Sequence, residues 1–362
     1  MTVSPYPLMV AGFMSGTSLD GVDVAVIKTD GLRIFDDRES FTYSYPLSFQ
    51  KRLKAILGQQ HITQEVRDIT RELMDYHIKA YEKLSHTKAI DIIAIHGHSV
   101  FHDPDGLKGV PRTWQLCDPQ YLQKALCKPI FYDFRSYDVA HGGQGAPLVP
   151  IFHLALAYDL AKPVIFLNIG GVSNFTFISS EDPLDLLAGD MGPGNALVND
   201  YVLEHFCTPY DRDGEIALSA EPDESVLQKW LNHPYFFKDF PKSLDRDTFH
   251  DFISDVAHLP YNKAVATLSE LTVQAIIQFL PVQPKTMIVC GGGRHNKYFM
   301  GRLQKNLSCD VVDCDVLGLN GDGIEAQAFA FLGARSFFNL PISFPKTTGV
   351  SKPTSGGRFL NI

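Results

Sequence analysis

The sequence has no G-x-x-x-x-G-K-[ST] segment, and this absence excludes a P-loop. No apolar run reaches the roughly 18 residues that a membrane-spanning helix needs, and no basic segment precedes the first apolar run. The six cysteines form no C-x-x-C pair, and several lie within apolar runs, which favours buried thiols in a reducing compartment. We therefore expect a cytoplasmic protein that makes no contact with a membrane.

The composition excludes further classes. With 32 basic and 41 acidic residues, the formal charge is −9, which argues against a broad nucleic-acid-binding surface. A hydrophobic content of 45% with 20% charged residues is typical of a globular domain. The length of 362 residues exceeds one ordinary core and predicts two domains. Because no short-period repeat is visible, solenoids and propellers are excluded.

Three apolar runs end abruptly in glycines, at residues 10–21, 164–171 and 286–293. The first two predict a strand, a glycine corner and a returning strand, and the third predicts a buried strand followed by a helix. Glycine lets the backbone approach an anion closely, so that N–H groups can point at phosphate oxygens. We interpret the two hairpins as phosphate clamps and the third corner as a nucleoside site, which together predict an ATP site. For the first loop the alternative is an ordinary hairpin turn, because Asp-Gly is a common turn pair.

The predicted ATP-binding residues come from these three corners. They are Gly16, Thr17, Ser18, Leu19, Asp20, Gly21, Val22 and Asp23 from the first, Asn168, Gly170 and Gly171 from the second, and Gly291, Gly292 and Gly293 from the third. Hydroxyl and backbone donors suit phosphate, whereas the acids suit metal-bound water or the positioning of donors. We expect Mg²⁺ beside the nucleotide, with its protein ligands unassigned.

The order of predicted elements divides the chain into two α/β halves. Residues 8–160 fit the order β-β-β-α-β-α-β-α, and the second half opens with a similar hairpin at 164–178. Helices are predicted near 193–206, 223–231, 262–280, 296–306 and 322–337, with strands at 286–293 and 310–313. This repetition suggests duplication and a bilobed body with its site between the lobes. The predicted domains are 1–160, joined by the segment 338–362, and 161–337.

The segment GDMGPGN at 189–195 follows an apolar stretch and precedes a predicted helix. Pro193 suits a helix start, and the glycines bring the backbone close to a ligand. Asp190 would stand at the head of the cleft, where it could act as a general base. The alternative is a turn or capping residue.

Two further polar segments and one acid are candidate ligand contacts. HGHSVFH at 96–102 predicts a polar loop that hydrogen-bonds a sugar; a zinc site is the alternative, although it would need further ligands. The segment 133–147 resembles an anion pocket around Arg135, or else an Arg–Asp pair that stabilises a domain edge. Glu325 either reaches the cleft or complements the N-terminus of its helix.

Ten segments, in order from about residue 12 to 357, make a resemblance specific. They are GFMSGTSLDGVDVAVI, HGHSVFH, DFRSYDVAHGGQGAPLVP, NIGGVSN, GDMGPGNALVNDY, PKSLDRD, ATLSELT, CGGGRHN, GIEAQAFAFLGAR and TTGVSKPTSGG. The chain resembles the anhydro-N-acetylmuramic acid kinases, a family of the superfamily of sugar kinases, heat-shock chaperones and actin ATPases.

The resemblance implies a two-lobed, actin-like α/β fold in which each lobe is a ribonuclease-H-like mixed sheet with flanking helices. It implies an enzyme that uses ATP, Mg²⁺ and water to open the ring of 1,6-anhydro-N-acetylmuramic acid and phosphorylate its 6-oxygen, in cell-wall recycling. Asp190 matches the catalytic aspartate. The resemblance also suggests a homodimer.

With the resemblance in view, we expect seven substrate-binding residues, which are His96, Ser99, Arg135, Asp138, Gly192, Asn195 and Glu325. The chain departs from the family pattern at a few positions. His98 and Ser99 stand where Gln and Thr are frequent, Met191 replaces a Thr beside the predicted base, Leu244 and Asp245 replace Thr-Gly, and Asn199 stands where Asp is frequent. None of these removes the predicted base or the phosphate glycines.

Two alternatives remain at this point. The first is a kinase for an ordinary sugar with a free hydroxyl, which Asp190 would deprotonate directly. The second is a non-enzymatic, actin-like nucleotide switch. A chaperone would need a separate peptide-binding domain, for which no residues are left over.

Overall fold

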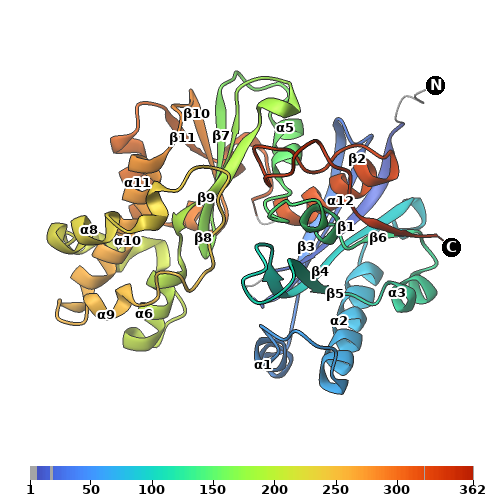
Figure 1. Cartoon of the computed structure of the whole chain (residues 1–362), viewed down its shortest axis with the longest axis horizontal. Helices are drawn as coiled ribbons and strands as arrows, with labels where there is room; N and C mark the ends of the chain where they lie inside the picture. Colours follow the sequence, from blue (N-terminus) through green and yellow to red (C-terminus); the bar gives the residue numbers. More distant parts are fainter. Residues whose placement is uncertain (1–5, 17–18, 322, 362) are drawn as a thin grey trace. The chain divides into compact units, whose positions relative to one another are not determined.

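The computed structural model describes residues 6–16, 19–321 and 323–361. The chain divides into two compact units, one formed by Met1–Tyr158 with Asp322–Ile362 and the other by Asp159–Gly321. Each unit contains one mixed β-sheet with helices packed against it (Figure 1). No helix in the described part of the chain is long and apolar enough to cross a membrane.

The first unit is built on a seven-stranded sheet with the order β12-β6-β4-β1-β2-β3, in which β5 also pairs with β4. Its helices and strands are β1 (Leu8–Ser15), β2 (Gly21–Thr29), β3 (Ile34–Ser44), α1 (Leu47–Ala55), α2 (Gln64–Glu82), β4 (Ile92–Asp103), β5 (Arg112–Leu116), α3 (Pro119–Leu126), β6 (Ile130–Tyr132), α4 (Ser136–Ala140), α5 (Pro150–Leu156), α12 (Ile324–Phe337) and β12 (Arg358–Leu360). The three antiparallel strands predicted for residues 10–45 are confirmed as β1, β2 and β3. Strands β4 and β6 continue the sheet in parallel with β1.

Helix α12 packs on β1, β2 and β4 of the first unit, which corrects our placement of residues 322–337 in the second half. Figure 1 shows this red C-terminal helix among the blue N-terminal strands. Small residues allow the close approach. A Cβ on Gly12 would lie 2.0 Å from the carbonyl oxygen of Ala326, and one on Gly333 would lie 2.6 Å from the Cβ of Ala94. The apolar pattern of α12 predicted a buried helix but did not indicate which sheet would cover it.

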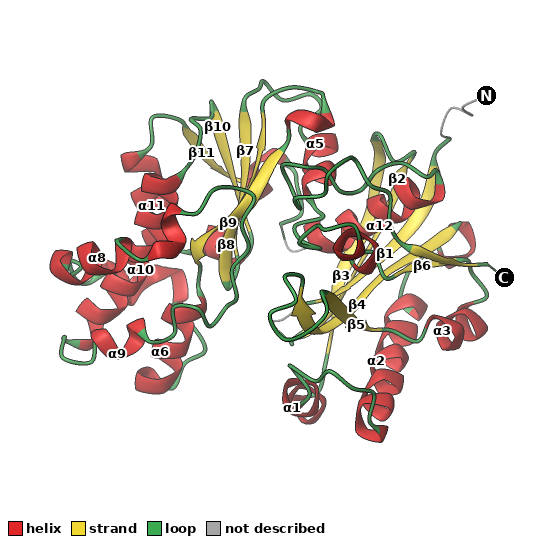
Figure 2. Ribbon diagram, viewed as in Figure 1, coloured by secondary structure: helices red, strands yellow, loops and turns green. Residues whose placement is uncertain are grey.

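The second unit is built on a five-stranded sheet with the order β11-β10-β7-β8-β9. Its helices and strands are β7 (Val164–Ile169), β8 (Val172–Ile178), β9 (Leu187–Pro193), α6 (Ala196–Phe206), α7 (Glu215–Leu218), α8 (Glu224–Leu231), α9 (Phe252–Asp255), α10 (Tyr261–Phe279), β10 (Thr286–Cys290), α11 (Lys297–Asn306) and β11 (Asp310–Asp313). Helices α6, α8, α10 and α11 share one apolar core with the sheet and lie on one side of it (Figure 2). Trp230 and Phe299 are among the largest side chains buried there.

The two sheets repeat one topology. In each, three sequential strands pair antiparallel, and two later strands extend the sheet in parallel from the first strand. This is the ribonuclease-H-like order, so the predicted α/β fold class is confirmed. The sequence did not predict β5 or β12. The segment 96–102, which we predicted to be a polar loop, is instead part of strand β4. There Gly97 takes a φ of +80°, and its Cα lies so close to β5 that a Cβ would be 2.3 Å from the carbonyl oxygen of Leu116.

We expect two helix glycines to respond oppositely to alanine. Nothing lies within 4 Å of a Cβ at Gly301, so Gly301→Ala should raise stability by about 1 kcal/mol through helix propensity. Gly333→Ala should lower stability by about 1–3 kcal/mol, because its new methyl group meets Ala94. Each unit holds one of the two tryptophans, Trp114 and Trp230, so urea unfolding followed by fluorescence reports on both units. Equal stabilisation by the two variants would contradict the close packing of α12.

Candidate functional site

The first glycine hairpin joins β1 to β2, and backbone hydrogen bonds hold its corner in place. The amide of Leu19 donates to the Gly16 carbonyl (3.3 Å), and the Asp20 carbonyl accepts from the amide of Tyr45 (2.9 Å). Leu19 has a φ of +62°, an uncommon conformation for a bulky residue that often marks functional loops. Thr17 and Ser18, which we predicted to bind ATP, lie outside the described residues. Val22 is fully buried, so only its backbone can serve a ligand.

Close packing against β3 requires glycine at position 21, because a Cβ there would lie 2.6 Å from the carbonyl oxygen of Tyr43. The acids of this loop differ in their surroundings. Asp23 accepts a hydrogen bond from the Thr42 hydroxyl (2.5 Å), whereas the Asp20 side chain is exposed. The two acids of this corner therefore differ in exposure, and the Asp20 carboxylate is the more exposed.

The second hairpin joins β7 to β8, and Asn195 braces its corner. The side-chain amide of Asn195 donates to the carbonyls of Ile169 and Gly170, both at 3.0 Å, and the amide of Gly194 donates to the Gly171 carbonyl. A Cβ on Gly170 or Gly171 would meet only ordinary contacts, at 3.6 and 3.8 Å, so the protein itself does not require glycine at either position. Open space beside backbone N–H groups is what a bound phosphate needs. Asn195, which we predicted to bind substrate, directs its amide group at this corner.

The third corner follows β10, and a buried arginine holds it. Arg294 donates from Nη1 to the Gly291 carbonyl (3.0 Å), and its Nε lies 3.3 Å from an Asp315 carboxylate oxygen. Gly291 has a φ of +73°, and a Cβ there would lie 2.3 Å from Oδ1 of Asn168, so this corner touches the end of β7. Gly292 has nothing within 4 Å of a Cβ. The structure therefore brings the second and third predicted corners together in one unit.

Asp190 lies in strand β9, so neither a turn nor a helix cap describes it. Its amide donates to the Lys242 carbonyl (2.9 Å), and its carbonyl accepts from the Tyr235 hydroxyl (2.8 Å). The carboxylate oxygen Oδ2 accepts from the amide of Leu244 (2.7 Å), while Oδ1 has no partner among the described residues. Burial raises the pKa of Asp190 to about 7, and the Leu244 hydrogen bond opposes part of that rise. A carboxyl group of this kind is suited to accept a proton near neutral pH.

The neighbours of Asp190 correct several details of the sequence interpretation. Met191 is fully buried in the core of the second unit, at the point where the register of β9 shifts against β8. Leu244 acts through its backbone amide, which explains why its side chain can differ from the family pattern. Pro193 ends β9 and does not start α6. Gly192 packs against Phe236, whose ring lies 3.0 Å from a built Cβ.

In the first unit, His96 and Arg135 form a connected polar group. Arg135 donates from Nε to Nε2 of His96 (2.8 Å) and from Nη1 to the Gly145 carbonyl (2.7 Å). Nδ1 of His96 contacts the Gly97 carbonyl (2.9 Å), so both ring nitrogens are engaged and a zinc site at the 96–102 segment is disfavoured. Burial lowers the pKa of Arg135 to about 10, and the carboxylates of Glu325 and Asp138 oppose that shift. Glu325, exposed on the first turn of α12, therefore lies within electrostatic range of Arg135.

Asp138 and His98 serve the protein's own structure. Asp138 is fully buried, and its two carboxylate oxygens accept from the Gly145 amide (2.5 Å) and the Thr348 hydroxyl (2.6 Å). We therefore correct its assignment from substrate binding to support of the glycine-rich loop after α4. His98 is also fully buried, and its Nδ1 lies 3.0 Å from Oγ of Ser15 at the end of β1. His98, where the chain departs from the family pattern, thus supports the end of β1 just before the first glycine corner.

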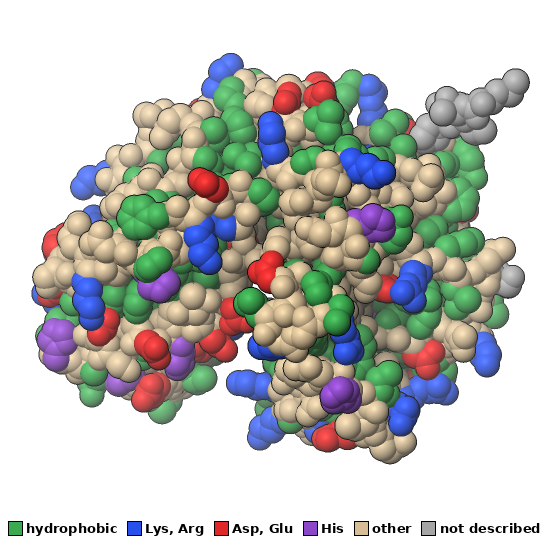
Figure 3. All heavy atoms as spheres, in the orientation of Figure 1, with side chains coloured by type: hydrophobic (Ala, Val, Ile, Leu, Met, Phe, Trp, Pro, Cys, Tyr) green, Lys and Arg blue, Asp and Glu red, His purple; other side chains and the backbone are tan. Residues whose placement is uncertain are grey.

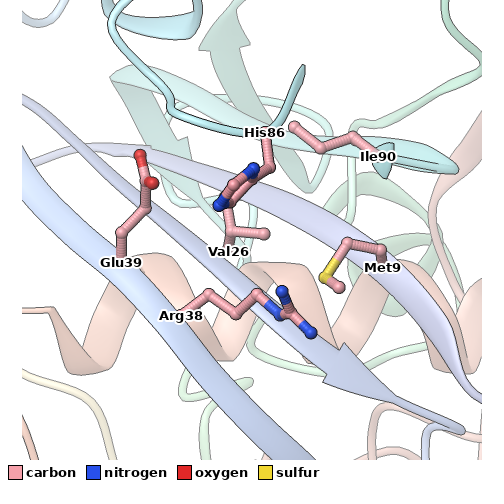
Figure 4. Close-up of a pocket in the computed structure, with 6 residues that line it drawn as sticks. All are labelled: Met9, Val26, Arg38, Glu39, His86 and Ile90. Atoms are coloured by element: carbon pink, nitrogen blue, oxygen red, sulfur yellow. The ribbon is translucent and has the colours of Figure 1, made fainter. Parts of the chain in front are cut away.

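Two of the hollows in the described part of the first unit differ in size. One is a cavity of 110 Å³ beside His96, between β5 and the segment that follows β6. The other has room for only 10 Å³ and lies at β1, β2 and β3; Figure 4 shows its six lining residues, none of them a predicted site residue.

In the described part of the chain, Asp313, Cys314 and Asp315 are the one close group of possible metal ligands, and the Arg294 cation already faces both acids. On the face drawn in Figure 3, acidic and basic side chains are interspersed.

Comparison with known proteins gives one family. The family model for anhydro-N-acetylmuramic acid kinase matches residues 8–361. The anhydro-N-acetylmuramic acid kinase of Gluconobacter oxydans is 42% identical over 360 residues, covering 96% of this chain and 98% of its own length. That of Acidiphilium cryptum is 40% identical over 355 residues, covering 96% and 97%. The chain belongs to the anhydro-N-acetylmuramic acid kinase family.

The resemblance of the ten sequence segments is thereby confirmed. Among solved structures, a ROK family glucokinase from Streptomyces griseus in complex with glucose and AMPPNP is similar with a TM-score of 0.42 and 13% identity, covering 90% of this chain and 99% of that one. A similarity as remote as this carries no argument about the site of this family member.

Sequence reasoning missed four residues that contact predicted site residues or line the larger hollow. Tyr235 and Leu244 bond to Asp190, Arg294 holds the third corner, and Gln115 lines the larger cavity. Leu244 lies within the quoted segment PKSLDRD, but a backbone donor has no sequence signal of its own. Gln115 lies in TWQLCDP, a segment without a predicted strand or motif, so no sequence signal pointed to it.

The raised pKa of Asp190 predicts a pH-dependent stability. The folded-state pKa of about 7 exceeds the unfolded value of 3.8, so the folded state holds the extra proton between these values, and stability falls as pH rises from about 4 to about 7. Asp190→Asn removes this effect and keeps an acceptor for the Leu244 amide. We expect the variant's advantage over the wild type to grow by about 2–3 kcal/mol between pH 5 and pH 8, because the folded-state pKa lies about two units above pH 5. Urea unfolding at both pH values measures this, and a constant difference would contradict the raised pKa.

Proposed function

We propose that this chain is an ATP-dependent kinase that opens the ring of 1,6-anhydro-N-acetylmuramic acid and phosphorylates its 6-oxygen. The substrate class is supported by membership of the family. The observation that carries the chemistry is the carboxyl group of Asp190, with one oxygen fixed by a backbone amide, the other without a partner among the residues described, and a pKa near 7. The product is N-acetylmuramic acid 6-phosphate, an intermediate for cell-wall recycling.

The chemistry of the substrate explains why a base is needed. In an anhydro sugar the 6-oxygen is already bonded to the anomeric carbon, so no free 6-hydroxyl exists to be deprotonated. Oδ1 of Asp190 accepts a proton from water as that water forms a bond to the anomeric carbon. The bond from that carbon to the 6-oxygen breaks, and the 6-oxygen attacks the γ-phosphorus of ATP, releasing ADP. Asp190 then returns its proton to solvent. A positioned base contributes on the order of 10²–10⁴ in rate.

The glycine corners would serve the nucleotide. A Cβ at Gly170 or Gly171 would meet only ordinary contacts, so a phosphate can approach the backbone there; we assign the corner at Gly16 the same role, and the corner at Gly291–Gly293 would border the nucleoside. The exposed carboxylate of Asp20 suits Mg²⁺, which prefers oxygen ligands and keeps several waters. When bound, Mg²⁺ would neutralise charge on the phosphates. The chain's own contribution is to orient these donors from two rigid sheets.

Sugar contacts are proposed in both units. His96, Ser99, Arg135 and Glu325 of the first unit, and Gly192 and Asn195 of the second, remain the proposed substrate-binding residues. A cytoplasmic location and a homodimer also stay predictions.

The first test is the release of ADP with ATP, Mg²⁺ and either 1,6-anhydro-N-acetylmuramic acid or N-acetylmuramic acid. We expect turnover with the anhydro sugar alone. In ¹⁸O-labelled water the label should enter the anomeric hydroxyl and not the phosphate, because water attacks carbon. Turnover of the reducing sugar alone would replace this proposal with an ordinary sugar kinase. Turnover of neither, with ATP binding retained, would favour a nucleotide switch.

A second test concerns Asp190 itself. Asp190→Asn should lower kcat by about 10²–10⁴ while leaving ATP binding unchanged, because the amide cannot take the proton from water. Asp310→Asn, which changes an exposed carboxylate of the same unit, is the matched control and should behave as wild type. In the wild type, kcat/KM should rise with pH and level off above about 7, where Asp190 is ionised. Near-normal turnover of Asp190→Asn in a folded, ATP-binding protein would rule out this role.

A further inference from the structure

Strand β9 is the last strand of its sheet, and at Asp190 it is bonded to the segment 235–244. The Asp190 amide donates to the Lys242 carbonyl (2.9 Å), and the Asp190 carbonyl accepts from the Tyr235 hydroxyl (2.8 Å). A Cβ on Gly189 would lie 3.1 Å from the Lys242 carbonyl oxygen, so the two backbones approach closely. Because an edge strand has a neighbouring strand on one side only, the position of Asp190 depends on these bonds.

The side chain of Lys242 joins the two partners of Asp190 to each other. Its Nζ donates to the carbonyls of Tyr235 (3.3 Å) and Phe236 (3.0 Å), in the short helical turn Pro234–Phe237. Asp190, Tyr235 and Lys242 therefore form a closed ring of hydrogen bonds, in which each residue is bonded to the other two. In such a network each bond restricts the groups that make the others.

Lys242 is a buried cation. The residue is 7% exposed, and Nζ lies 4.8 Å from the centre of the Tyr235 ring and 4.6 Å from that of Phe240. Its partners in the described part of the chain are carbonyl oxygens and aromatic rings, with no carboxylate at ion-pair distance. Burial lowers the pKa of Lys242 to about 8, so the side chain is still protonated at pH 7.

Stability of the fold does not explain a lysine at this position. A buried cation loses hydration, and without a carboxylate partner that loss is unfavourable for folding. A methionine would fill nearly the same space without a charge. What the ammonium group supplies is a pair of charge-assisted hydrogen bonds to the turn, which are stronger than those of a neutral donor. The proton transfer proposed for Asp190 makes no direct use of this side chain.

We propose that Lys242 is a positioning residue for the base, and that its ammonium group holds Tyr235 and its own backbone where they fix Asp190. The inference rests on the proposed function, because it takes the role of Asp190 from there. None of the glycine corners belongs to this ring of hydrogen bonds. The effect of Lys242 is therefore expected on the chemical step and not on the binding of ATP.

The first test is Lys242→Met, which keeps the length of the side chain and removes its charge and donors. With 1,6-anhydro-N-acetylmuramic acid we expect kcat to fall about 10-fold to 100-fold and KM for ATP to change less than about 3-fold, because a misplaced base slows the chemical step. Tyr235→Phe removes the hydroxyl on the other side of the ring and should lower kcat as well, by a smaller factor. Lys238→Met, the same substitution at an exposed lysine of the segment, is the matched control and should behave as wild type.

A second test places Lys242→Met in the Asp190→Asn variant. Because Lys242 acts through the base, its loss should lower kcat less than about 3-fold once that base is gone. A merely structural role would lower kcat by the same factor in both backgrounds. Urea unfolding followed by tryptophan fluorescence establishes that each variant is folded, and Tyr235→Phe tests the same ring if Lys242→Met does not fold.

Three results would overturn the inference. They are a wild-type kcat in folded Lys242→Met, an equal loss of kcat with and without Asp190, and a rise in KM for ATP at unchanged kcat. A failure of the proposed function is distinguishable from all three. It would appear as no turnover of the anhydro sugar by the wild type, or as near-normal turnover by Asp190→Asn alone.

Discussion

The proposed chemistry depends on the carboxyl group of Asp190, which strand β9 holds in a partly buried position. The backbone amide of Asp190 donates to the Lys242 carbonyl, and its carbonyl accepts from the Tyr235 hydroxyl. The amide of Leu244 donates to one of its carboxylate oxygens. Burial raises its pKa because the charged form loses hydration, and the single hydrogen bond does not restore that loss. The same burial that makes the group a useful base therefore makes its ionised form unfavourable for folding. Such an opposition between stability and reactivity is typical of active sites.

The glycines discussed above occupy their positions for two different physical reasons. At Gly12, Gly21 and Gly333 the protein itself fills the space where a Cβ would lie, so these glycines bring α12 and β3 close to their neighbours. A Cβ at Gly170 or Gly171 would meet only ordinary contacts, and one at Gly292 would meet nothing within 4 Å, so the fold does not require glycine at these positions. The sequence pattern shows both kinds as identical runs. Tertiary packing separates them, and only the second kind is suited to border a phosphate or nucleoside.

Polar groups behind the proposed sugar residues fix how those residues can act. Arg135 takes one nitrogen of His96, so that histidine is held as an acceptor in the first unit. The amide nitrogen of Gln115 donates to the hydroxyls of Thr113 and Ser99, which fixes the amide group. Ser15, between Tyr45 and His98, fixes the end of β1 just before the first phosphate corner. In each case a buried network sets the orientation of a side chain or loop that a ligand would meet.

The sequence by itself determined the repeated strand–glycine–strand units, the order of most helices and strands, and Asp190 as the candidate base, because alternation and glycine corners are local signals. It could not determine that α12 joins the first sheet, since an apolar helix fits either core. It could not assign Leu244 to Asp190, because the contact joins residues 54 positions apart and uses a backbone amide that every residue type except proline offers. It could not separate Asp138, which is buried with both oxygens paired, from ligand-facing acids. Contacts between residues far apart in the sequence determine these features, and such contacts produce no periodic pattern from which they could be predicted.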